Sequence, residues 1–309
     1  MAIPANAWDN YWIGSEAGVS DSEGISHPVL DEFWQRQFES VGDDEIIVDL
    51  GCGRGALLQH LPDRHVVISL DLSAAALRSL RSRRPEILPL AADLQRLPVK
   101  ASSVDRVVSQ FGVEYGGAAA LESLADLVAP GGWIQAVLHC RNSVVDKESR
   151  ACLAATERFL AIGFIQDAVR MFEMGYEVLK GNATPGDARP LAVKVAEDIR
   201  SVNDLFADYG PDITGGSIRS IVENVGRIQA GIQNYDEQEV MGWIGNQQGE
   251  MNDYAERLRS MIDAALSDQL FEGLCEQLST NQFVVREAKS LMVNQGEPLA
   301  WVLVAQKSG

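Results

Sequence analysis

A glycine-rich turn between an apolar run and a helical segment constrains the fold of this chain more than any other feature. Residues 46–50 form a short β-branched run, and the turn follows at once. It reads, in order, Asp49, Leu50, Gly51, Cys52, Gly53, Arg54 and Gly55. Glycines let the backbone turn sharply and approach a ligand without Cβ clashes, and the free N–H groups at a helix start then face that ligand. The turn therefore predicts a ligand-binding loop between a first strand and a helix over 57–61.

The spacing of apolar runs predicts an α/β fold. Short strand-like runs alternate with helical segments, at residues 46–50, 66–70, 87–91, 104–109 and 133–138. This alternation predicts a parallel sheet with helices on both faces. Two further strands are predicted at 283–286 and 299–304, with Gly296, Glu297 and Pro298 as a hairpin-type connection between them.

The strand pattern disappears between these two regions. Residues 141–280 read as several amphipathic helices broken by loops. We therefore predict a core formed by residues 1–140 and 281–309, with an N-terminal helical lead that includes a helix over 27–41. Residues 141–280 are predicted to be a helical insertion before the last two strands.

Charge and hydropathy exclude several classes of partner. The 309 residues carry a formal net charge of −18, which repels phosphate backbones and anionic membrane surfaces. No apolar run reaches the ~18 residues of a transmembrane helix, and the first residues lack the pattern of a signal peptide. We expect neither nucleic acid nor membrane as a partner, whereas a homodimer is compatible with the sequence.

The cysteines indicate a reducing compartment. The chain has four, none in a Cys-x-x-Cys pair or with histidines at zinc-binding spacing. We therefore predict no metal site and no disulfide framework, and we expect the protein to be cytoplasmic.

Polar residues follow the predicted strands at their carboxyl ends, where ligands bind in open α/β sheets. An acid placed like Asp71, after the second strand and before Leu72, accepts hydrogen bonds from ribose hydroxyls in nucleotide-binding folds. The other candidates follow the third and fourth strands, namely Asp93, Leu94, Ser109 and Gln110. Together they predict a nucleotide-like ligand at this edge of the sheet.

In the order and spacing of these motifs, the chain resembles class I S-adenosylmethionine-dependent methyltransferases over roughly residues 27–140 and 281–306. The turn from Asp49 to Gly55, with Cys52 inside it, is similar to the family's first motif, and Asp71 matches its ribose-binding acid. The resemblance implies that Asp93 and Leu94 meet the adenine. It also implies a Rossmann-like sheet of seven strands with an antiparallel terminal hairpin, and S-adenosylmethionine as cofactor.

Three side chains are candidates for contact with the methyl acceptor. Glu114 and Tyr115 follow the fourth strand and His139 follows the fifth, close to the expected site of methyl delivery. Each can serve as a base where the acceptor arrives protonated, and each can equally be an ordinary rim or capping residue. An aromatic cluster around Tyr11, with Trp8 and Trp12, either folds over a cationic cofactor or clasps the core.

The resemblance implies methyl transfer to a nitrogen, oxygen or sulfur nucleophile of a small molecule, with the helical insertion as a lid. Holding the acceptor close and aligned provides much of the acceleration of such an in-line displacement. One alternative is a protein that binds S-adenosylmethionine without transferring its methyl group. A less favoured alternative is a nicotinamide-dependent oxidoreductase, because the Gly-x-Gly-x-Gly spacing departs from the dinucleotide fingerprint.

Overall fold

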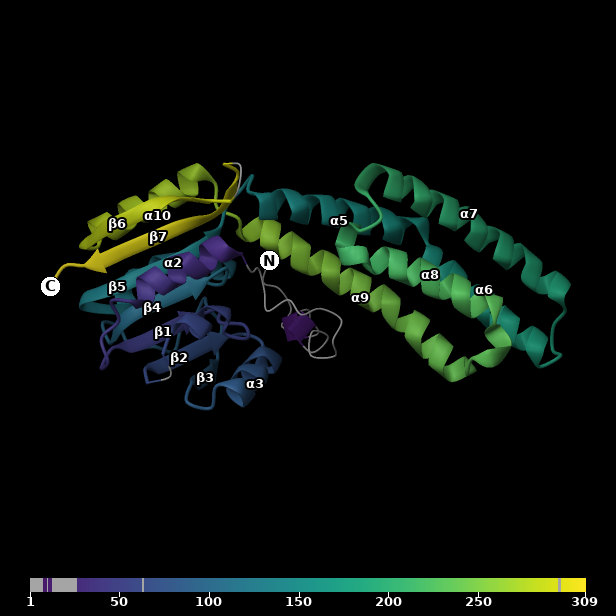
Figure 1. The fold of residues 1–309 in the computed structure, drawn as a ribbon, viewed down its shortest axis with the longest axis horizontal. Coiled ribbons are helices and arrows are strands. Elements are labelled where there is room, and N and C mark those ends of the chain that lie inside the picture. Colours follow the sequence, from purple (N-terminus) through teal and green to yellow (C-terminus); the bar gives the residue numbers. More distant parts are fainter. Residues whose placement is uncertain (1–7, 10, 13–26, 63, 294–295) are drawn as a thin grey trace. The chain divides into compact units, whose positions relative to one another are not determined.

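The protein folds into two compact units. The computed structural model describes residues 8–9, 11–12, 27–62, 64–293 and 296–309 (Figure 1). The first unit, here called the sheet unit, comprises Met1–Lys147 and Ser260–Gly309, and the second, the helical unit, comprises Glu148–Arg259.

A seven-stranded sheet forms the centre of the sheet unit. Its strands are β1 (Ile46–Leu50), β2 (Val66–Asp71), β3 (Leu88–Ala91), β4 (Val104–Gln110), β5 (Val128–His139), β6 (Phe283–Met292) and β7 (Pro298–Lys307). The spatial order is β3-β2-β1-β4-β5-β7-β6. The first five strands run parallel to their neighbours, and β7 is antiparallel to both β5 and β6. The predicted fold, a mostly parallel sheet with an antiparallel terminal hairpin, is confirmed.

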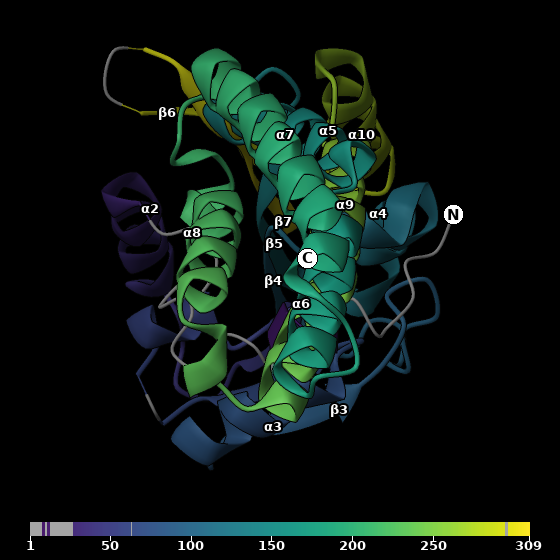
Figure 2. The same cartoon turned by 90° about the vertical axis from the view of Figure 1, so that its right-hand side faces the viewer.

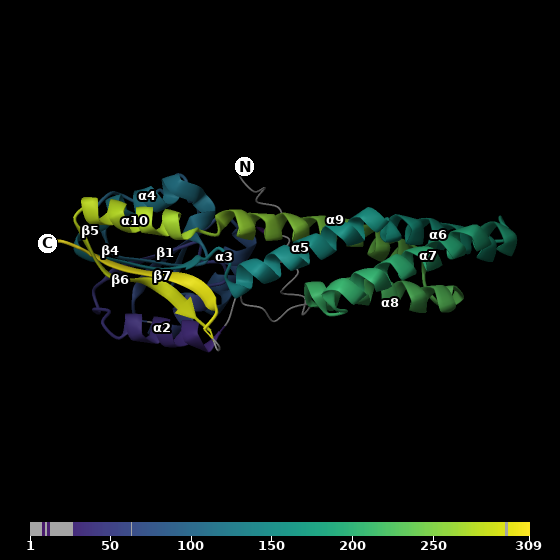
Figure 3. The same cartoon turned by 90° about the horizontal axis from the view of Figure 1, so that it is seen from above.

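Helices cover both faces of this sheet, which explains why its central strands are apolar throughout. On one face, α2 (Pro28–Phe38) and α3 (Ala74–Arg83) pack against strand residues such as Ile47. On the other face, α4 (Gly117–Leu127) and α10 (Asp268–Thr280) pack against residues such as Val48 (Figure 3). Both of these strand side chains are fully buried.

Three elements differ most clearly from those predicted. Strand β6 continues to Met292, six residues past the predicted end at residue 286. The segment after the glycine-rich turn is a short 3-10 helix, η1 (Ala56–His60), which Pro62 follows closely. Strand β5 begins at Val128 and includes residues 130–132, because the register shift between Val104 and Arg106 of β4 accommodates them.

The helical unit is shorter than the predicted insertion of residues 141–280. Helix α10 lies in the sheet unit, where its apolar side chains Phe271, Leu274 and Leu278 join the core on the face of the sheet that α4 also covers. An amphipathic helix packed on a sheet has the same residue pattern as one packed on other helices. The sequence pattern therefore does not mark this boundary.

The helical unit has a core of its own. Its elements are α5 (Val144–Ile162), α6 (Phe164–Leu179), α7 (Pro185–Tyr209), η3 (Ile213–Gly216), α8 (Ser217–Ala230), η4 (Ile232–Asn234) and α9 (Glu237–Ala264). Fully buried side chains such as Phe164, Phe172 and Ile244 hold these helices together. Figure 2 shows helices α5 to α9 of this unit in teal and green. The ends of the unit fall within α5 and α9, where Arg259 pairs with Glu157 at 2.7 Å. Among the described residues, no helix combines the length and apolarity that crossing a bilayer requires.

Candidate cofactor pocket and active site

The glycine-rich turn exposes backbone where side chains would not fit. Gly51 has φ +66°, and a Cβ there would lie 2.5 Å from the Cα of Gly112 in the loop after β4. Gly53 has φ +50°, and a Cβ there would lie 2.8 Å from the indole of Trp12. L side chains rarely adopt such positive φ values. The turn is therefore held between the β4 loop and the N-terminal segment, with bare backbone at its surface.

Asp71 at the end of β2 links this turn to the start of α3. Its Oδ2 accepts a hydrogen bond from the backbone N–H of Gly53, and its Oδ1 accepts one from the N–H of Ser73, both at 2.8 Å. Burial raises the pKa of Asp71, although these two hydrogen bonds oppose the rise. Each carboxylate oxygen retains a further lone pair, so the group can still accept hydrogen bonds from a ligand's hydroxyls.

Asp49 places a second buried carboxylate next to the first. Its side chain is fully buried, and neither oxygen accepts a hydrogen bond from any described residue. Burial and then the charge of Asp71 raise the pKa of Asp49 well above its ordinary value. A buried carboxylate without partners is costly, which favours a positively charged ligand nearby.

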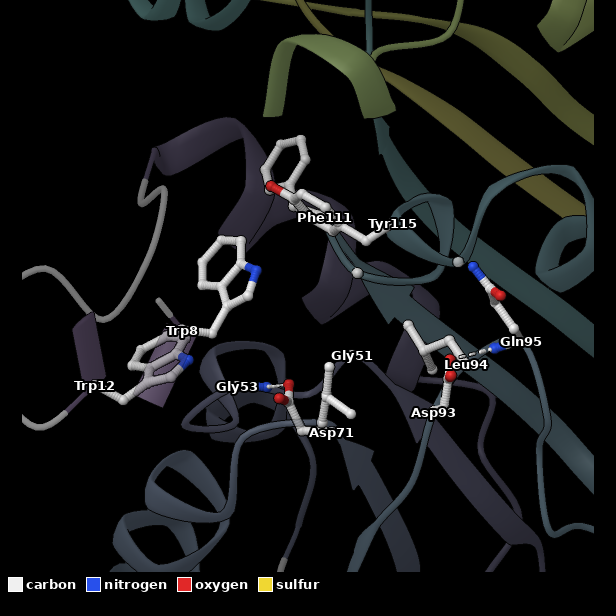
Figure 4. Close-up of a pocket in the computed structure, with 13 residues that line it drawn as sticks. Trp8, Trp12, Gly51, Gly53, Asp71, Asp93, Leu94, Gln95, Phe111 and Tyr115 are labelled. Carbon is white, nitrogen blue, oxygen red and sulfur yellow. Dashed lines mark hydrogen bonds between the residues drawn. The ribbon is translucent and has the colours of Figure 1, made fainter. Parts of the chain in front are cut away.

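A pocket opens beside these groups at the carboxyl ends of the strands (Figure 4). Its lining residues are Trp8, Trp12, Gly51, Gly53, Asp71, Leu72, Asp93, Leu94, Gln95, Phe111, Gly112, Tyr115 and Gly116. The space between these residues amounts to about 770 Å³, which includes a part open to solvent. Among the described residues, its lining contains two carboxylates and four aromatic side chains but no Lys, Arg or His.

The N-terminal residues form one aromatic side of the pocket. The Asp9 carboxylate accepts hydrogen bonds from the Ser73 hydroxyl (2.5 Å) and the Ala75 N–H (3.2 Å) at the start of α3. Arg54 donates to the carbonyl of Trp12 at 2.6 Å. These contacts fix the backbone around Trp8 and Trp12, whose rings line the pocket.

The loop after β3 forms another part of the lining. Asp93 and Leu94 both line the pocket, and the Asp93 carboxylate accepts a hydrogen bond from the N–H of Gln95 at 2.9 Å. Leu94 also packs against the core. One polar and one apolar residue are thus presented side by side to a ligand.

Behind the pocket, Glu114 and His139 form a buried pair. Glu114 Oε1 lies 2.7 Å from His139 Nδ1 and accepts a hydrogen bond from the His139 backbone N–H at 2.8 Å. The ring of His139 contacts two side chains of the pocket lining, with centroid distances of 4.6 Å to Phe111 and 5.5 Å to Tyr115. Burial, followed by the charge of Glu114, raises the pKa of Tyr115 well above its ordinary value. The pair lies one side chain behind the pocket surface.

The structure therefore brings seven of the predicted site residues to the pocket surface. These are Gly51, Gly53, Asp71, Leu72, Asp93, Leu94 and Tyr115. The other predicted site residues do not line it, namely Tyr11, Asp49, Cys52, Gly55, Ser109, Gln110, Glu114 and His139.

Several of these eight have other contacts. The Ser109 hydroxyl donates to the Leu50 carbonyl (2.7 Å) and accepts from the Val113 N–H (2.9 Å), which ties β1 to the loop after β4. Gln110 Oε1 accepts from the Trp34 indole at 2.5 Å. Cys52 packs in the core between the sheet, α2 and α3, and burial raises the pKa of its thiol.

Gly55 and Tyr11 also face other neighbours. A Cβ at Gly55 would lie 2.6 Å from a methyl group of Leu80 on α3, so this glycine allows helix packing. The ring of Tyr11 contacts those of Trp8 and Trp12, with centroid distances of 6.0 and 4.7 Å.

Some lining residues were not among the predicted cofactor-binding residues. They are Trp8, Trp12, Gln95, Phe111, Gly112 and Gly116. Residues 8, 9, 11 and 12 have helical backbone, and an i, i+4 spacing places Trp8 and Trp12 on one helix face. Tyr11, at i+3 from Trp8, is a helix neighbour as well, so the spacing predicts the aromatic face but does not show which of its rings line the pocket. The close approach of Gly112 to Gly51 leaves no comparable signal in the sequence.

Comparison with known proteins agrees with this geometry. Residues 47–132 match the family model described as a methyltransferase domain. Demethylmenaquinone methyltransferase of Beutenbergia cavernae is 31% identical over 109 residues, which are 33% of this chain and 45% of that protein. Mouse (Mus musculus) mitochondrial arginine-hydroxylase NDUFAF5 is 26% identical over 151 residues, which are 48% of this chain and 44% of that protein. The chain thus spans less than half the length of these curated relatives.

Among solved structures, similarity is found to the SAM-bound amino pentose methyltransferase CalS10 of Micromonospora echinaspora. The identity is 25%, the TM-score is 0.32, and the match covers 40% of this chain and 55% of that one.

The match over residues 47–132 spans the glycine-rich turn, Asp71 and the loop after β3, all within a sheet of the order described above. The chain carries a class I S-adenosylmethionine-dependent methyltransferase domain, and the resemblance noted in the sequence is confirmed. The cofactor of this domain is S-adenosylmethionine. The pocket fits such a cation, because bare glycine backbone, the carboxylates of Asp71 and Asp93 and four aromatic side chains line it, without a competing basic side chain among the described residues.

Proposed function

We propose that this protein transfers a methyl group from S-adenosylmethionine to a nucleophile on a small molecule. The observation that carries the proposal is the lining of the pocket, where the glycine-rich turn and Asp71 face the rings of Trp8, Phe111 and Tyr115. The cofactor supplies a methyl group that its positively charged sulfur already activates. The protein then needs mainly to hold the acceptor close and aligned.

The lining residues have distinct proposed roles. Asp71 accepts hydrogen bonds from the ribose hydroxyls, and Asp93 with the backbone N–H of Leu94 recognises the adenine. The faces of Trp8 and Trp12 stabilise positive charge on sulfur through cation–π attraction. Asp49 does not line the pocket and burial raises its pKa, so a cation bound nearby favours its ionised form.

The same lining argues against a nicotinamide dinucleotide. A pyrophosphate carries negative charge and is usually bound by helix N-termini and basic groups. Here two carboxylates line the pocket and, in the described part of the chain, no basic side chain does. A neutral or cationic acceptor is favoured for the same reason, and with a net charge of −18 a small molecule fits better than a nucleic acid.

We further propose that the helical unit encloses the acceptor and excludes water during transfer. The helical unit begins at Glu148, soon after His139, the last residue of β5. Binding of S-adenosylmethionine without methyl transfer remains the second candidate, since one partial match is to a protein named as a hydroxylase. That candidate predicts cofactor binding without methylation of any acceptor.

Calorimetric titration tests the cofactor assignment directly. We expect the purified protein to bind S-adenosylmethionine and S-adenosylhomocysteine with micromolar affinity and NADH not at all. We expect Asp71→Ala to weaken binding of both adenosyl ligands ~100-fold or more, since the ribose loses charge-assisted hydrogen bonds and the turn loses its anchor. Asp126→Ala, at an exposed position of α4, is the matched control. Binding of NADH, or unchanged affinity in Asp71→Ala, contradicts the assignment.

A further inference from the structure

The pair of Glu114 and His139 is more completely buried than a surface ion pair. The side chain of Glu114 is 0% exposed and that of His139 is 4% exposed. They come from different elements, because Glu114 lies in η2 (Val113–Gly116) after β4 and His139 is the last residue of β5. Burial of such a pair costs desolvation free energy without guaranteeing a net gain in stability. A role beyond stability therefore has to be considered.

The contacts of Glu114 fix where the imidazole carries its proton. Oε1 already accepts from the backbone N–H of His139 (2.8 Å), which can only donate. An ionised carboxylate is acceptor-only, so the 2.7 Å contact with Nδ1 requires a proton on Nδ1. In the neutral ring, Nε2 then carries the lone pair. Nε2 is buried and has no hydrogen-bond partner among the described residues.

The ring of His139 lies directly behind an aromatic part of the pocket lining. Phe111 and Tyr115 both line the pocket and both contact the ring of His139. Phe111 also has φ +52°, which is a strained conformation for a bulky residue. Such a conformation persists only where the surrounding structure over-determines it. The Phe111 ring is thus held at the boundary between the pocket and the buried pair.

We propose that His139 Nε2 is the base that accepts the proton of the methyl acceptor, and that Glu114 is its positioning residue. This inference rests on the proposed function and narrows its substrate class to acceptors whose nucleophilic atom carries a proton, such as phenols, thiols and protonated amines. The acceptor enters between the rings of Phe111 and Tyr115.

Bonds and charge balance in the proposed methyl transfer. The electron pair of the acceptor atom forms the bond to the methyl carbon, and the carbon–sulfur bond breaks with its electrons remaining on sulfur. The acceptor proton moves to Nε2, and the resulting imidazolium is stabilised by the Glu114 carboxylate 2.7 Å from Nδ1. The proton leaves to solvent when the product is released.

The tautomer provides a test that does not depend on turnover. The chain has four histidines, so long-range ¹H–¹⁵N spectra of histidine-labelled protein resolve few signals, and the spectrum of His139→Gln assigns the relevant one. We expect the Nδ1–H tautomer in the wild type and in Glu114→Gln, whose amide oxygen can still accept both hydrogen bonds. We expect a mixture of tautomers in Glu114→Met. An Nε2–H tautomer in the wild type overturns the proposal.

Kinetics provide the second test, using catechol, dithiothreitol and tyramine as proton-bearing acceptors. Pyridine serves as a neutral acceptor whose nucleophilic nitrogen carries no proton. We expect His139→Gln to lower kcat ~10²–10⁴-fold with the proton-bearing acceptors, the usual range for a general base. We expect its rate with pyridine and its affinity for S-adenosylmethionine to stay within ~3-fold of the wild type. Glu114→Gln should give an intermediate loss of kcat, because a neutral amide stabilises imidazolium less well.

The matched control is His65→Gln. His65 is also buried, at 4% exposure, but it precedes β2 and does not line the pocket. Equal losses of kcat with pyridine and with the proton-bearing acceptors overturn the proposal and indicate a structural role. A wild type that fails to bind S-adenosylmethionine overturns the proposed function itself, whereas normal cofactor binding with the wrong tautomer overturns only the role of the pair.

Discussion

The two halves of the pocket edge are built by different means. Around β1 and β2, backbone groups and glycine conformations define the surface. At Gly51, for example, a Cβ would lie only 2.5 Å from the Cα of Gly112. Around β4 and β5, buried side chains that contact one another define it, as in the pair of Glu114 and His139. The first half has little freedom to change without loss of the fold. The second half can change its chemistry through single side chains, which suits a part of the pocket that meets the acceptor.

Gly51→Ala should have the largest effect, because it combines a positive φ with a backbone clash at Gly112. We expect the free energy of unfolding to fall by about 3 kcal/mol or more, and binding of S-adenosylmethionine to be lost. Urea denaturation and calorimetry measure both. Gly117→Ala is the matched control, since its φ is +69° but a Cβ there meets no atom within 4 Å. Similar losses of stability in the two variants indicate that the positive φ, rather than the close contact with Gly112, causes most of the effect.

Asp49→Asn should separate stability from binding in the backbone-built half. Burial raises the pKa of Asp49, so the folded state binds a proton at a higher pH than the unfolded chain, whose Asp titrates near ~3.9. Wild-type stability therefore rises as the pH falls from neutral through the raised pKa, and it is lowest above that pKa. We expect the variant to be about 1–3 kcal/mol more stable at pH 7 but to bind S-adenosylmethionine more weakly.

Urea denaturation at pH 7.5 and at pH 5 checks this expectation. The difference between variant and wild type should shrink at the lower pH. Asp105→Asn is the control, since the Asp105 carboxylate accepts a hydrogen bond from the Ile46 N–H at 2.8 Å. A variant of Asp49 that is less stable at both pH values contradicts the expected cost of its buried charge.

Ser109→Ala should show how strongly the two halves are coupled. Without the hydroxyl, the Leu50 carbonyl and the Val113 N–H each lose a partner. We expect a loss of about 1–3 kcal/mol in the free energy of unfolding, with affinity for S-adenosylmethionine within ~3-fold of the wild type. Ser123→Ala, which removes a hydroxyl bonded within α4, should cost less than 1 kcal/mol by the same measurement. A large loss of affinity would instead give Ser109 a role in binding.

Asp9→Ala should have the smallest effect. It removes the hydrogen bonds to Ser73 and Ala75 at the start of α3, and lost caps cost about 0.5–2 kcal/mol. We expect affinity for S-adenosylmethionine to fall a few-fold, because the backbone around Trp8 and Trp12 is less well held. Asp9→Asn, which keeps an acceptor oxygen, should retain most of the affinity. Equal losses of affinity in Asp9→Ala and Asp9→Asn indicate that binding depends on the negative charge of Asp9 rather than on its hydrogen bonds to α3.

The same contrast explains what the sequence could predict. Gly51 and Gly53 follow β1 directly and Asp71 ends β2, the next strand along the chain, so their local pattern predicts both the turn and the ligand. The contact between Glu114 and His139 depends instead on the register of β4 with β5, in which Gln110 pairs with Val137. Residue types and spacing nominate both side chains, but they do not show that the two meet or that they lie behind Phe111.

A similar ambiguity limits the prediction of domain boundaries from the sequence. The apolar stripe of α10 fits a helical bundle as well as a sheet face, and only the core contacts of Phe271 and Leu274 assign it to the sheet unit. The early start of β5 depends on a register shift next to Val104, which leaves no pattern in the sequence.

The pairing of β5 with β7 has a consequence for the order of folding. His139 lies opposite Ala300, so this pair of strands closes a long loop of chain that contains the whole helical unit. Loop-closure entropy grows with the logarithm of the free length. A helical unit that folds first, with its ends joined by Arg259 and Glu157, shortens that free length and lowers the closure cost by about 1 kcal/mol. Early folding of the inserted helices thus makes it easier for the last strands to complete the sheet.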